Sequence, residues 1–254
     1  WAMIGQSPAY ELLHVHAVDG TPITAIYGTA CDEMDRPISD AVHAPTMVYF
    51  YGNGMCAANC FAEFHRFRRL GCNVIVTDYP GFGMSGGKPS EAGVYAAADA
   101  AYAAACERAD PSKIIAVGWS LGGAAAIDLA SRKPVIGLIT FSAFTSMTEM
   151  GRIFFPWLPT SWFIQSRFEN ERKIGSVNAP MLLIHGQHDT LVPFVMNARL
   201  AATARAAGRE VTTLAVNTDH ADVFQDSGDE MDAAILNFLA RLHAHGPITP
   251  LAAH

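Results

Sequence analysis

The stretch Gly118-Trp119-Ser120-Leu121-Gly122 has the pattern G-x-S-x-G, and the rest of the chain is interpreted outward from it. The apolar run before it, 114–117, predicts a buried strand, and the small residues of 122–130 predict a helix. A sharp turn from strand to helix holds a serine in strained geometry with its hydroxyl exposed. The helix N-terminus offers unpaired N–H groups that suit a developing oxyanion. Ser120 is therefore predicted to be a nucleophile rather than an incidental serine in a glycine-rich turn.

A second G-x-S-x-G pattern, at 83–87, centres on Ser85. Two glycines follow Ser85 directly, and Pro89 comes soon after them. A helix cannot start on Ser85 through these residues. We interpret this stretch as a loop and its match to the pattern as accidental.

Composition limits the class of protein. The chain has 254 residues, half of them hydrophobic, with a formal charge of −7, which predicts one domain with a large core. The acidic balance argues against nucleic acid or an anionic membrane surface as a partner. No apolar run reaches the length of a membrane span. Because the chain begins at Trp1 rather than Met, we expect a shortened or processed product whose signal peptide or anchor, if it had one, has been removed.

The cysteines are odd in number and match no disulfide framework: Cys31, Cys56, Cys60, Cys72 and Cys106. Cys56 and Cys60 lie four residues apart and are predicted to share a helix face as buried thiols, in preference to a metal pair or a bridge. Reduced cysteines favour a cytoplasmic location. An exported or anchored form remains the alternative.

Short apolar runs alternate with helical segments along most of the chain. This alternation predicts an α/β fold, with a mostly parallel sheet covered on both faces. Asp19-Gly20 predicts a hairpin that adds antiparallel strands at one edge. The predicted strands are 12–18, 23–29, 46–51, 74–77, 114–117, 135–140, 181–184 and 211–216, and the predicted helices are 57–70, 90–109, 122–130, 193–207 and 229–243.

Residues 144–178 interrupt the alternation and are rich in large apolar side chains. We interpret them as a short helical cap inserted in a single domain, 1–254, whose tail, 246–254, is expected to be loosely ordered. These side chains either pack on the core, as such residues usually do, or line a pocket above Ser120. We expect at least one aromatic residue to face that pocket, and the candidates are Phe144, Phe155, Trp157 and Trp162.

A serine hydroxyl needs a base, and the base needs an orienting carboxylate. When the serine lies on a strand-to-helix turn, the acid and then the histidine follow it in the chain. Asp189 comes just after the predicted strand 181–184, and His220 just after 211–216. Both lie at carboxyl ends of strands, where ligands bind in such sheets. We predict Asp189 as the acid and His220 as the base.

Other polar residues near these two have simpler explanations. His185 precedes the loop and is expected to pack or bond locally, and His188 to lie on the surface. Asp219 and His220 are neighbours on an extended segment, so their side chains point apart. Residue type alone allows His185, His188 and His220 as zinc ligands, but no cysteine or glutamate clusters with them. We therefore expect no metal.

An oxyanion hole needs two N–H donors. One is expected from Leu121, the residue after the nucleophile, and the other from the loop after the third strand. That loop is Gly52-Asn53-Gly54-Met55, and we predict the backbone N–H of Asn53, with Met55 as the alternative. A plain glycine turn would also explain the two glycines.

Five pieces of the chain, in this order, resemble the α/β-hydrolase superfamily, and within it the small-cap esterase and thioesterase-like members. They are the stretches 52–54, 78–91, 118–123, 185–193 and 219–220, so the resemblance spans about 10–242. It implies an α/β-hydrolase fold with about eight strands. Relatives usually carry a histidine before the glycine of the 52–54 turn, and here Tyr51 stands in that place. Its hydroxyl is expected to brace the loop as the histidine does.

The resemblance implies a serine hydrolase that cleaves carboxylic esters or thioesters through an acyl-enzyme, with no cofactor or metal. Ser120 would attack, His220 would transfer the proton, Asp189 would orient His220, and the N–H groups of Asn53 and Leu121 would hold the oxyanion. The aromatic cap suggests a small-molecule substrate with an apolar acyl or alcohol group. An amidase or peptidase would use the same residues. A non-catalytic binding protein on this fold is the third alternative.

Overall fold

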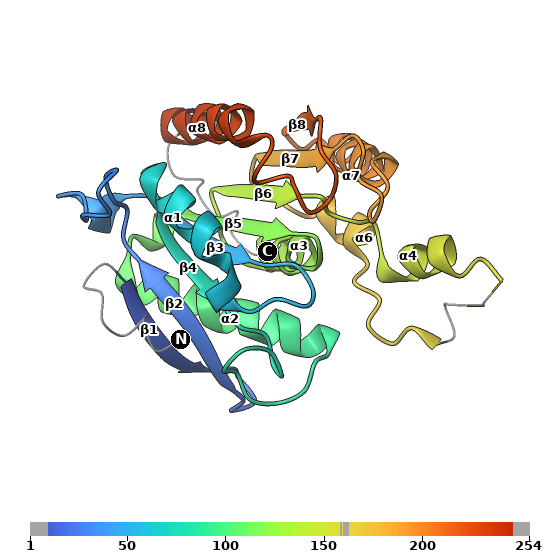
Figure 1. Cartoon of the computed structure of the whole chain (residues 1–254), viewed down its shortest axis with the longest axis horizontal. Helices are drawn as coiled ribbons and strands as arrows, with labels where there is room; N and C mark the ends of the chain where they lie inside the picture. Colours follow the sequence, from blue (N-terminus) through green and yellow to red (C-terminus); the bar gives the residue numbers. More distant parts are fainter. Residues whose placement is uncertain (1–9, 158, 160–162, 246–254) are drawn as a thin grey trace, which may run out of the picture.

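The computed structural model describes residues 10–157, 159 and 163–245, and its centre is an eight-stranded sheet of order β1-β2-β4-β3-β5-β6-β7-β8 (Figure 1). β1 and β2 form the antiparallel edge hairpin, and β2 also pairs antiparallel with β4. All remaining pairs are parallel. This confirms the predicted fold class. The strands are β1 Tyr10–His16, β2 Pro22–Gly28, β3 Thr46–Phe50, β4 Asn73–Thr77, β5 Ile114–Trp119, β6 Gly137–Phe141, β7 Met181–Gly186 and β8 Val211–Val216.

Helices cover both faces of the sheet. The α-helices with assigned bounds are α1 Phe61–Arg69, α2 Glu91–Arg108, α3 Leu121–Arg132, α4 Met147–Phe154, α6 Asn170–Ile174, α7 Val195–Ala206 and α8 Gly228–His245. α2, α3, α6 and α7 pack on one another in succession. Gly28 lies against Phe64 of α1, and Gly137 lies against Phe238 of α8. The strand register puts these glycines on one face, so α1 and α8 share the face opposite α3. None of the helices in the described residues is long and apolar enough to cross a bilayer.

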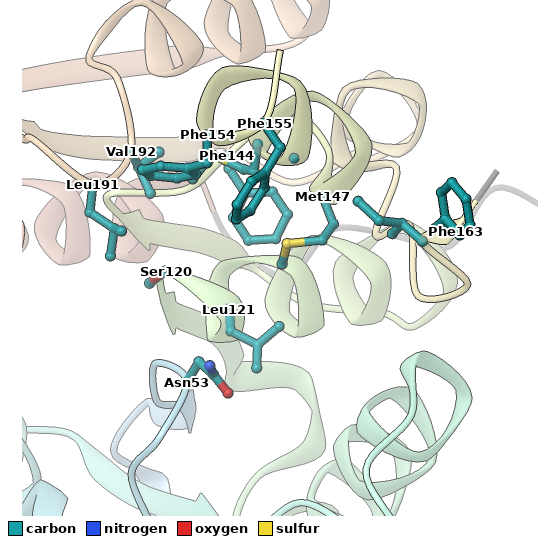
Figure 2. A pocket seen from close by; sticks show the side chains of 13 residues that line it. Asn53, Ser120, Leu121, Phe144, Met147, Phe154, Phe155, Phe163, Leu191 and Val192 are labelled. Atoms are coloured by element: carbon teal, nitrogen blue, oxygen red, sulfur yellow. The ribbon is translucent and has the colours of Figure 1, made fainter. Parts of the chain in front are cut away.

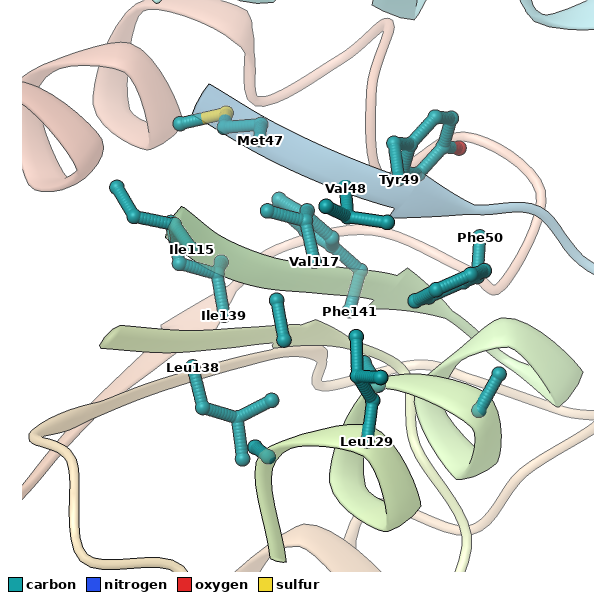
Figure 3. Close-up of a cluster of buried hydrophobic side chains, with 14 of the residues drawn as sticks. Met47, Val48, Tyr49, Phe50, Ile115, Val117, Leu129, Leu138, Ile139 and Phe141 are labelled. Carbon is teal, nitrogen blue, oxygen red and sulfur yellow. The ribbon is translucent and has the colours of Figure 1, made fainter. Parts of the chain in front are cut away.

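The packing of the core explains why the sequences of the central strands are continuous apolar runs. Every residue of β3, β4 and β6 is buried, because helices cover both faces. Figure 3 shows the side chains alternating between the faces, with Tyr49 on one side and Leu138 facing Leu129 of α3 on the other. α3 is buried along almost its whole length. Its glycine and alanine residues let the helix approach the sheet closely.

One predicted helix is divided. The segment 57–70 begins as a 3₁₀ helix, η3 (Ala57–Cys60), and continues as α1. Cys56 is the extended N-cap of η3, held by hydrogen bonds with Asn59, so Cys56 and Cys60 do not share a helix face. The physical reason is this local cap, which fixes a tight first turn. All five cysteines are free.

The predicted cap leaves the sheet after β6 and contains α4 and α6. Its two ends are joined: Glu171 N–H donates to the carbonyl oxygen of Thr145 at 3.0 Å, and Met147 N–H donates to that of Arg167 at 2.7 Å. Ser146 caps α4 through the N–H of Glu149. α4 extends beyond the carboxyl ends of the central strands (Figure 1). The predicted tail, 246–254, lies outside the described residues.

The strand order creates a crevice at the carboxyl ends of β3 and β5. These strands are neighbours, but the chain runs from β3 outward to β4 before it returns to β5 and continues to β6 on the other side. Ligands bind at such a switch point in open α/β sheets. Asn53 follows β3, and Ser120 follows β5.

Candidate active site

Ser120 occupies a strained turn between β5 and α3. Its backbone angles are φ 54° and ψ −114°, a conformation that residues other than glycine rarely adopt. A Cβ on Gly118 would lie 2.1 Å from the carbonyl oxygen of Gly122, and one on Gly122 would lie 2.0 Å from that of Phe50. Both flanking glycines are therefore required by close backbone approach, which explains the spacing of the motif.

Asp189 and His220 meet across the ends of β7 and β8. His220 Nδ1 lies 2.8 Å from Asp189 Oδ2, which is the hydrogen bond that their positions in the chain predict. The other carboxylate oxygen accepts from the N–H groups of Leu191 at 3.0 Å and Val192 at 2.6 Å. The carboxylate is fully buried and His220 nearly so. The acid is thus fixed on the loop that follows β7.

Two opposing effects act on the ionisation of Asp189. Burial by itself raises the pKa of the carboxyl group. Hydrogen bonds from His185, His220 and the N–H of Val192 favour the charged form and outweigh burial, so the pKa of Asp189 lies below its usual value. The site therefore contains a buried carboxylate that stays ionised.

The imidazole of His220 lies next to the serine turn. Its ring stacks on Trp119, which immediately precedes Ser120, with centroids 5.6 Å apart and planes 29° apart. Phe224 contacts the same indole edge-on at 5.6 Å. Nδ1 bonds to Asp189, and none of the described residues hydrogen-bonds to Nε2, the other nitrogen of the ring. This tautomer arrangement is the one a general base needs.

Asp219 has a different role from Asp189. Its carboxylate accepts from the backbone N–H of Thr190 at 2.8 Å and from that of His220 at 2.7 Å. The Thr190 hydroxyl bonds to it as well. Asp219 therefore joins the loops after β7 and β8. Within the described residues its hydrogen bonds go to Thr190 and to the backbone N–H of His220, not to the imidazole ring. His188 is exposed and bonds to Asn217 Oδ1 at 2.8 Å.

The residues predicted for the oxyanion hole lie in the loop after β3 and at the start of α3. Asn53 and Leu121 both line the pocket that contains Ser120. A Cβ on Gly52 would be 3.3 Å from Trp119 Cε3 and 3.6 Å from the Cβ of Ser120, so the loop lies against the serine turn. Leu121 is the first residue of α3, where backbone N–H groups have no partner within the helix.

Tyr51 braces this loop through a buried network. Its hydroxyl donates to Asp78 Oδ1 at 2.9 Å, and its carbonyl oxygen accepts from the Tyr79 hydroxyl at 2.8 Å. Asp78 also accepts from the N–H groups of Ala57 and Met84. Burial raises the pKa of Asp78, although these donors oppose the shift. The hydroxyl of Tyr51 thus ties the turn to the start of η3 and to the loop after β4.

Ser85 belongs to this structural loop and not to the site. Its hydroxyl donates to the carbonyl oxygen of Asp78 at 3.0 Å and accepts from the N–H of Thr24 at 2.9 Å. Both hydrogen-bonding functions of the oxygen are used within the fold. The second G-x-S-x-G match is therefore explained by loop structure.

A pocket of about 530 Å³ opens above Ser120, and none of the described residues that line it is charged. Figure 2 shows the serine below a wall of aromatic and aliphatic side chains. The wall comes mostly from α4 and from the residues that flank it. The lining residues are Asn53, Ser120, Leu121, Phe144, Met147, Met150, Gly151, Phe154, Phe155, Phe163, Ile164, Leu191 and Val192.

Of the four aromatic candidates in the cap, Phe144 and Phe155 line the pocket. Trp157 does not, because it follows the end of α4 and Pro156; its ring is 77 % exposed and contacts only the edge of Phe155 among aromatic rings of the described residues. Trp162 lies outside the described residues. The alternation pattern did not identify Met147 and Met150, whose place in the pocket depends on how α4 is turned.

No group of three or more His, Cys, Asp or Glu side chains is arranged to hold a metal ion within the part of the chain that the structure describes. His185, one of the three histidines considered as zinc ligands, instead has its Nε2 atom 3.2 Å from Asp189 Oδ2. This contact was not expected from the sequence. The only signal for it is the spacing of four residues across the turn after β7.

Comparisons with known proteins agree with this fold. The model of the alpha/beta hydrolase family matches residues 42–182, more than half of the chain. An uncharacterized protein of Mycobacterium tuberculosis is 38 % identical over 172 residues, which cover 67 % of this chain and 60 % of that protein. The match therefore spans about three-fifths of this relative's length.

Solved structures resemble the chain at low sequence identity. An esterase of Pyrococcus furiosus has a TM-score of 0.73 at 19 % identity, covering 91 % of this chain and 90 % of the esterase. A puromycin-hydrolyzing peptidase of Mycobacterium tuberculosis has a TM-score of 0.70 at 16 % identity, covering 94 % of this chain and 40 % of the peptidase. At such identities the likeness shows the fold alone, and the fold serves hydrolases of more than one bond type.

Proposed function

This chain belongs to the alpha/beta hydrolase family, and from that premise we propose that it is a serine hydrolase that cleaves carboxylic or thiol esters through an acyl-enzyme. One observation carries the proposal. A buried carboxylate, Asp189, bonds to the imidazole of His220, and that imidazole stacks on the residue before Ser120, which lies in a strained turn at the base of an apolar pocket.

The reaction follows from these positions. The hydroxyl oxygen of Ser120 attacks the carbonyl carbon of the ester while His220 Nε2 takes its proton. Asp189 stabilises the resulting imidazolium, and the N–H groups of Asn53 and Leu121 hold the oxyanion. His220 then protonates the leaving alcohol or thiol. Water, activated by the same imidazole, releases the acid and restores Ser120.

The pocket favours an uncharged apolar acyl group. Its volume of about 530 Å³ lies within the usual range for small-molecule sites. Among the described lining residues, the polar side chains are those of Asn53 and Ser120. A charged substrate group would lose its hydration there without gaining a partner. This argues for esters with an aliphatic or aromatic acyl chain.

Two measurements test the proposal. A fluorophosphonate probe should label wild-type protein and leave Ser120→Ala unlabelled. A series of p-nitrophenyl esters should be hydrolysed with kcat/KM rising with acyl length until the pocket is filled, since each buried methylene is worth about 0.8 kcal/mol. Absence of labelling in the folded wild type would instead support a non-catalytic binding protein.

An amidase or peptidase would use the same residues. The lining residues that the structure describes are uncharged and would not hold the terminal charge of a peptide, which favours the ester. A matched ester and amide with the same acyl group separate the two activities. Faster cleavage of the amide would contradict the ester assignment and leave the catalytic residues unchanged.

A further inference from the structure

The side chain of His185 is fully buried beneath the loop that carries Asp189. It is the fifth residue of β7, one residue before the strand ends. Its Nε2 atom lies 2.9 Å from the carbonyl oxygen of Val192 and 3.2 Å from Asp189 Oδ2. Phe194 packs edge-on against its ring at 5.7 Å. A histidine with two such contacts is more than a space-filling residue.

The contacts define which ring nitrogen carries the proton. A carbonyl oxygen only accepts, so Nε2 must be the donor toward Val192. The same N–H points to the neighbouring carboxylate oxygen of Asp189 as a second, shared acceptor. Nδ1 is buried with no hydrogen-bond partner. The geometry therefore places a proton on Nε2.

We propose that His185 is a positioning residue that holds the catalytic carboxylate; this rests on the proposed function. Asp189 Oδ2 bonds to His220 Nδ1 and lies 3.2 Å from His185 Nε2, while Oδ1 is held by backbone N–H groups. With both oxygens held, the carboxylate cannot rotate away from His220. His185 thereby sets the orientation of the catalytic base through the acid, without touching the substrate.

The same N–H also connects the acid to the pocket. Val192, whose carbonyl oxygen it binds, lines the pocket together with Leu191. These residues bond to Asp189 through their own N–H groups. His185 thus completes a small ring of hydrogen bonds that links Asp189 to Val192 in the wall of the pocket. The position of one therefore fixes the position of the other.

The test compares His185→Leu with His185→Gln. Leucine fills the space but donates nothing, whereas the glutamine amide has two N–H groups for the two acceptors. His188→Leu is the matched control, because His188 is exposed and its side chain bonds to Asn217. Rates are expressed per active site, counted by complete fluorophosphonate labelling, so that a loss of folded protein does not affect them.

We expect kcat to fall about tenfold to a hundredfold in His185→Leu, since a small misplacement of a catalytic group has this effect. KM should change less than threefold, His185→Gln should recover most of the rate, and His188→Leu should match wild type. Equal rates in His185→Leu and wild type would overturn the proposal. So would equal losses in the leucine and glutamine variants, which would indicate packing alone.

A second readout does not depend on turnover. The proton on His220 Nδ1 gives a downfield NMR resonance, which should shift or vanish in His185→Leu and persist in His188→Leu. If the wild type hydrolyses no ester, the proposed function fails, yet this resonance still tests the contact between His185 and Asp189. An unchanged resonance in His185→Leu would overturn the positioning role.

Discussion

At the scale of single residues, Ser120 is held in its backbone conformation by two glycines that no larger residue can replace. Removing its hydroxyl leaves this geometry intact. We expect Ser120→Ala to keep its melting temperature within a few degrees and to lose about 10⁴- to 10⁶-fold in kcat, as loss of a member of such a triad does. Ester hydrolysis and thermal unfolding measure the two effects.

Ser85→Ala is the control for that variant. It alters the other G-x-S-x-G match and removes only hydrogen bonds within the loop after β4. Its activity should stay near that of the wild type. If Ser85→Ala were inactive while Ser120→Ala hydrolysed esters, the nucleophile would be misassigned.

The ionisation of Asp189 links the site to stability. Its pKa is lowered in the folded protein, so the unfolded chain, with an aspartate pKa of about 3.9, binds the proton more readily. The stabilisation is therefore complete above about pH 4 and is lost as the pH falls further toward the folded-state pKa. Urea unfolding of wild type and Asp189→Asn at several pH values should show a shallower acid decline in the variant. Parallel declines would contradict this linkage.

The residues of the site differ in how far the sequence reveals them. Ser120, Asp189 and His220 follow from chain order and from their places after strands, because the parallel sheet brings those strand ends to one edge. His185 does not follow from order. Its contact with Asp189 depends on how the loop after β7 curls back, which no pattern of residue types encodes.

At the scale of elements, the turn after β3 depends on one hydroxyl group. Tyr51→Phe removes the hydrogen bond to Asp78 and leaves that buried carboxylate with one donor fewer. Such a loss costs about 1–3 kcal/mol. We expect a lower melting temperature and a larger fall in kcat than in 1/KM, because the loop carries an oxyanion donor. A variant with unchanged kcat would show that the loop is held without Tyr51.

The aromatic side chains at the end of α4 offer a matched pair for testing specificity. Phe155 lines the pocket and Trp157 does not, although both are exposed, at 51 % and 77 %. Phe155→Ala should lower kcat/KM for long acyl esters more than for short ones and alter the melting temperature little. Trp157→Ala should leave the dependence on chain length unchanged. Identical profiles in the two variants would mean that specificity lies elsewhere in the pocket.

Most elements were predictable from periodicity alone. Ser90, which caps the helix, and Asp110-Pro111, which ends it, predict the bounds of α2 to within one residue. The division of 57–70 was not predicted, because the spacing of apolar residues does not reveal the cap that Cys56 and Asn59 form at the start of η3. The pocket lining was only partly predictable, since the rotation of α4 is set by contacts between elements and not by its own sequence.

At the scale of the whole molecule, ion pairs join the helices beneath the site. Asp128 of α3 accepts from Lys173 of α6 at 2.7 Å and pairs with Arg132, which also binds Asp99 of α2. Three helices of one face are thereby tied together behind the turn that holds Ser120. On the opposite face, Arg66 of α1 pairs with Asp232 of α8 at 2.8 Å.

Most of the cap takes no part in these ion pairs. Its contribution to folding can therefore be tested by replacing it in the full chain. Replacing residues 148–165 with a short Gly/Ser linker retains the hydrogen bonds between Thr145 and Glu171 and between Met147 and Arg167. We expect the shortened protein to fold, as judged by circular dichroism, and to hydrolyse short esters without preference for long ones. Loss of cooperative unfolding would show that the cap is part of the core.

The joined ends of this segment also bear on how such an enzyme changes over time. Because the chain departs and returns at one place, insertions between those points alter loop entropy only slowly with length and leave the strand ends where they are. Substrate recognition and catalytic chemistry can therefore change independently of each other during evolution. Evolution can exchange the cap segment that contacts the substrate while Ser120, Asp189 and His220 stay fixed. A protein engineer can transplant this segment in the same way.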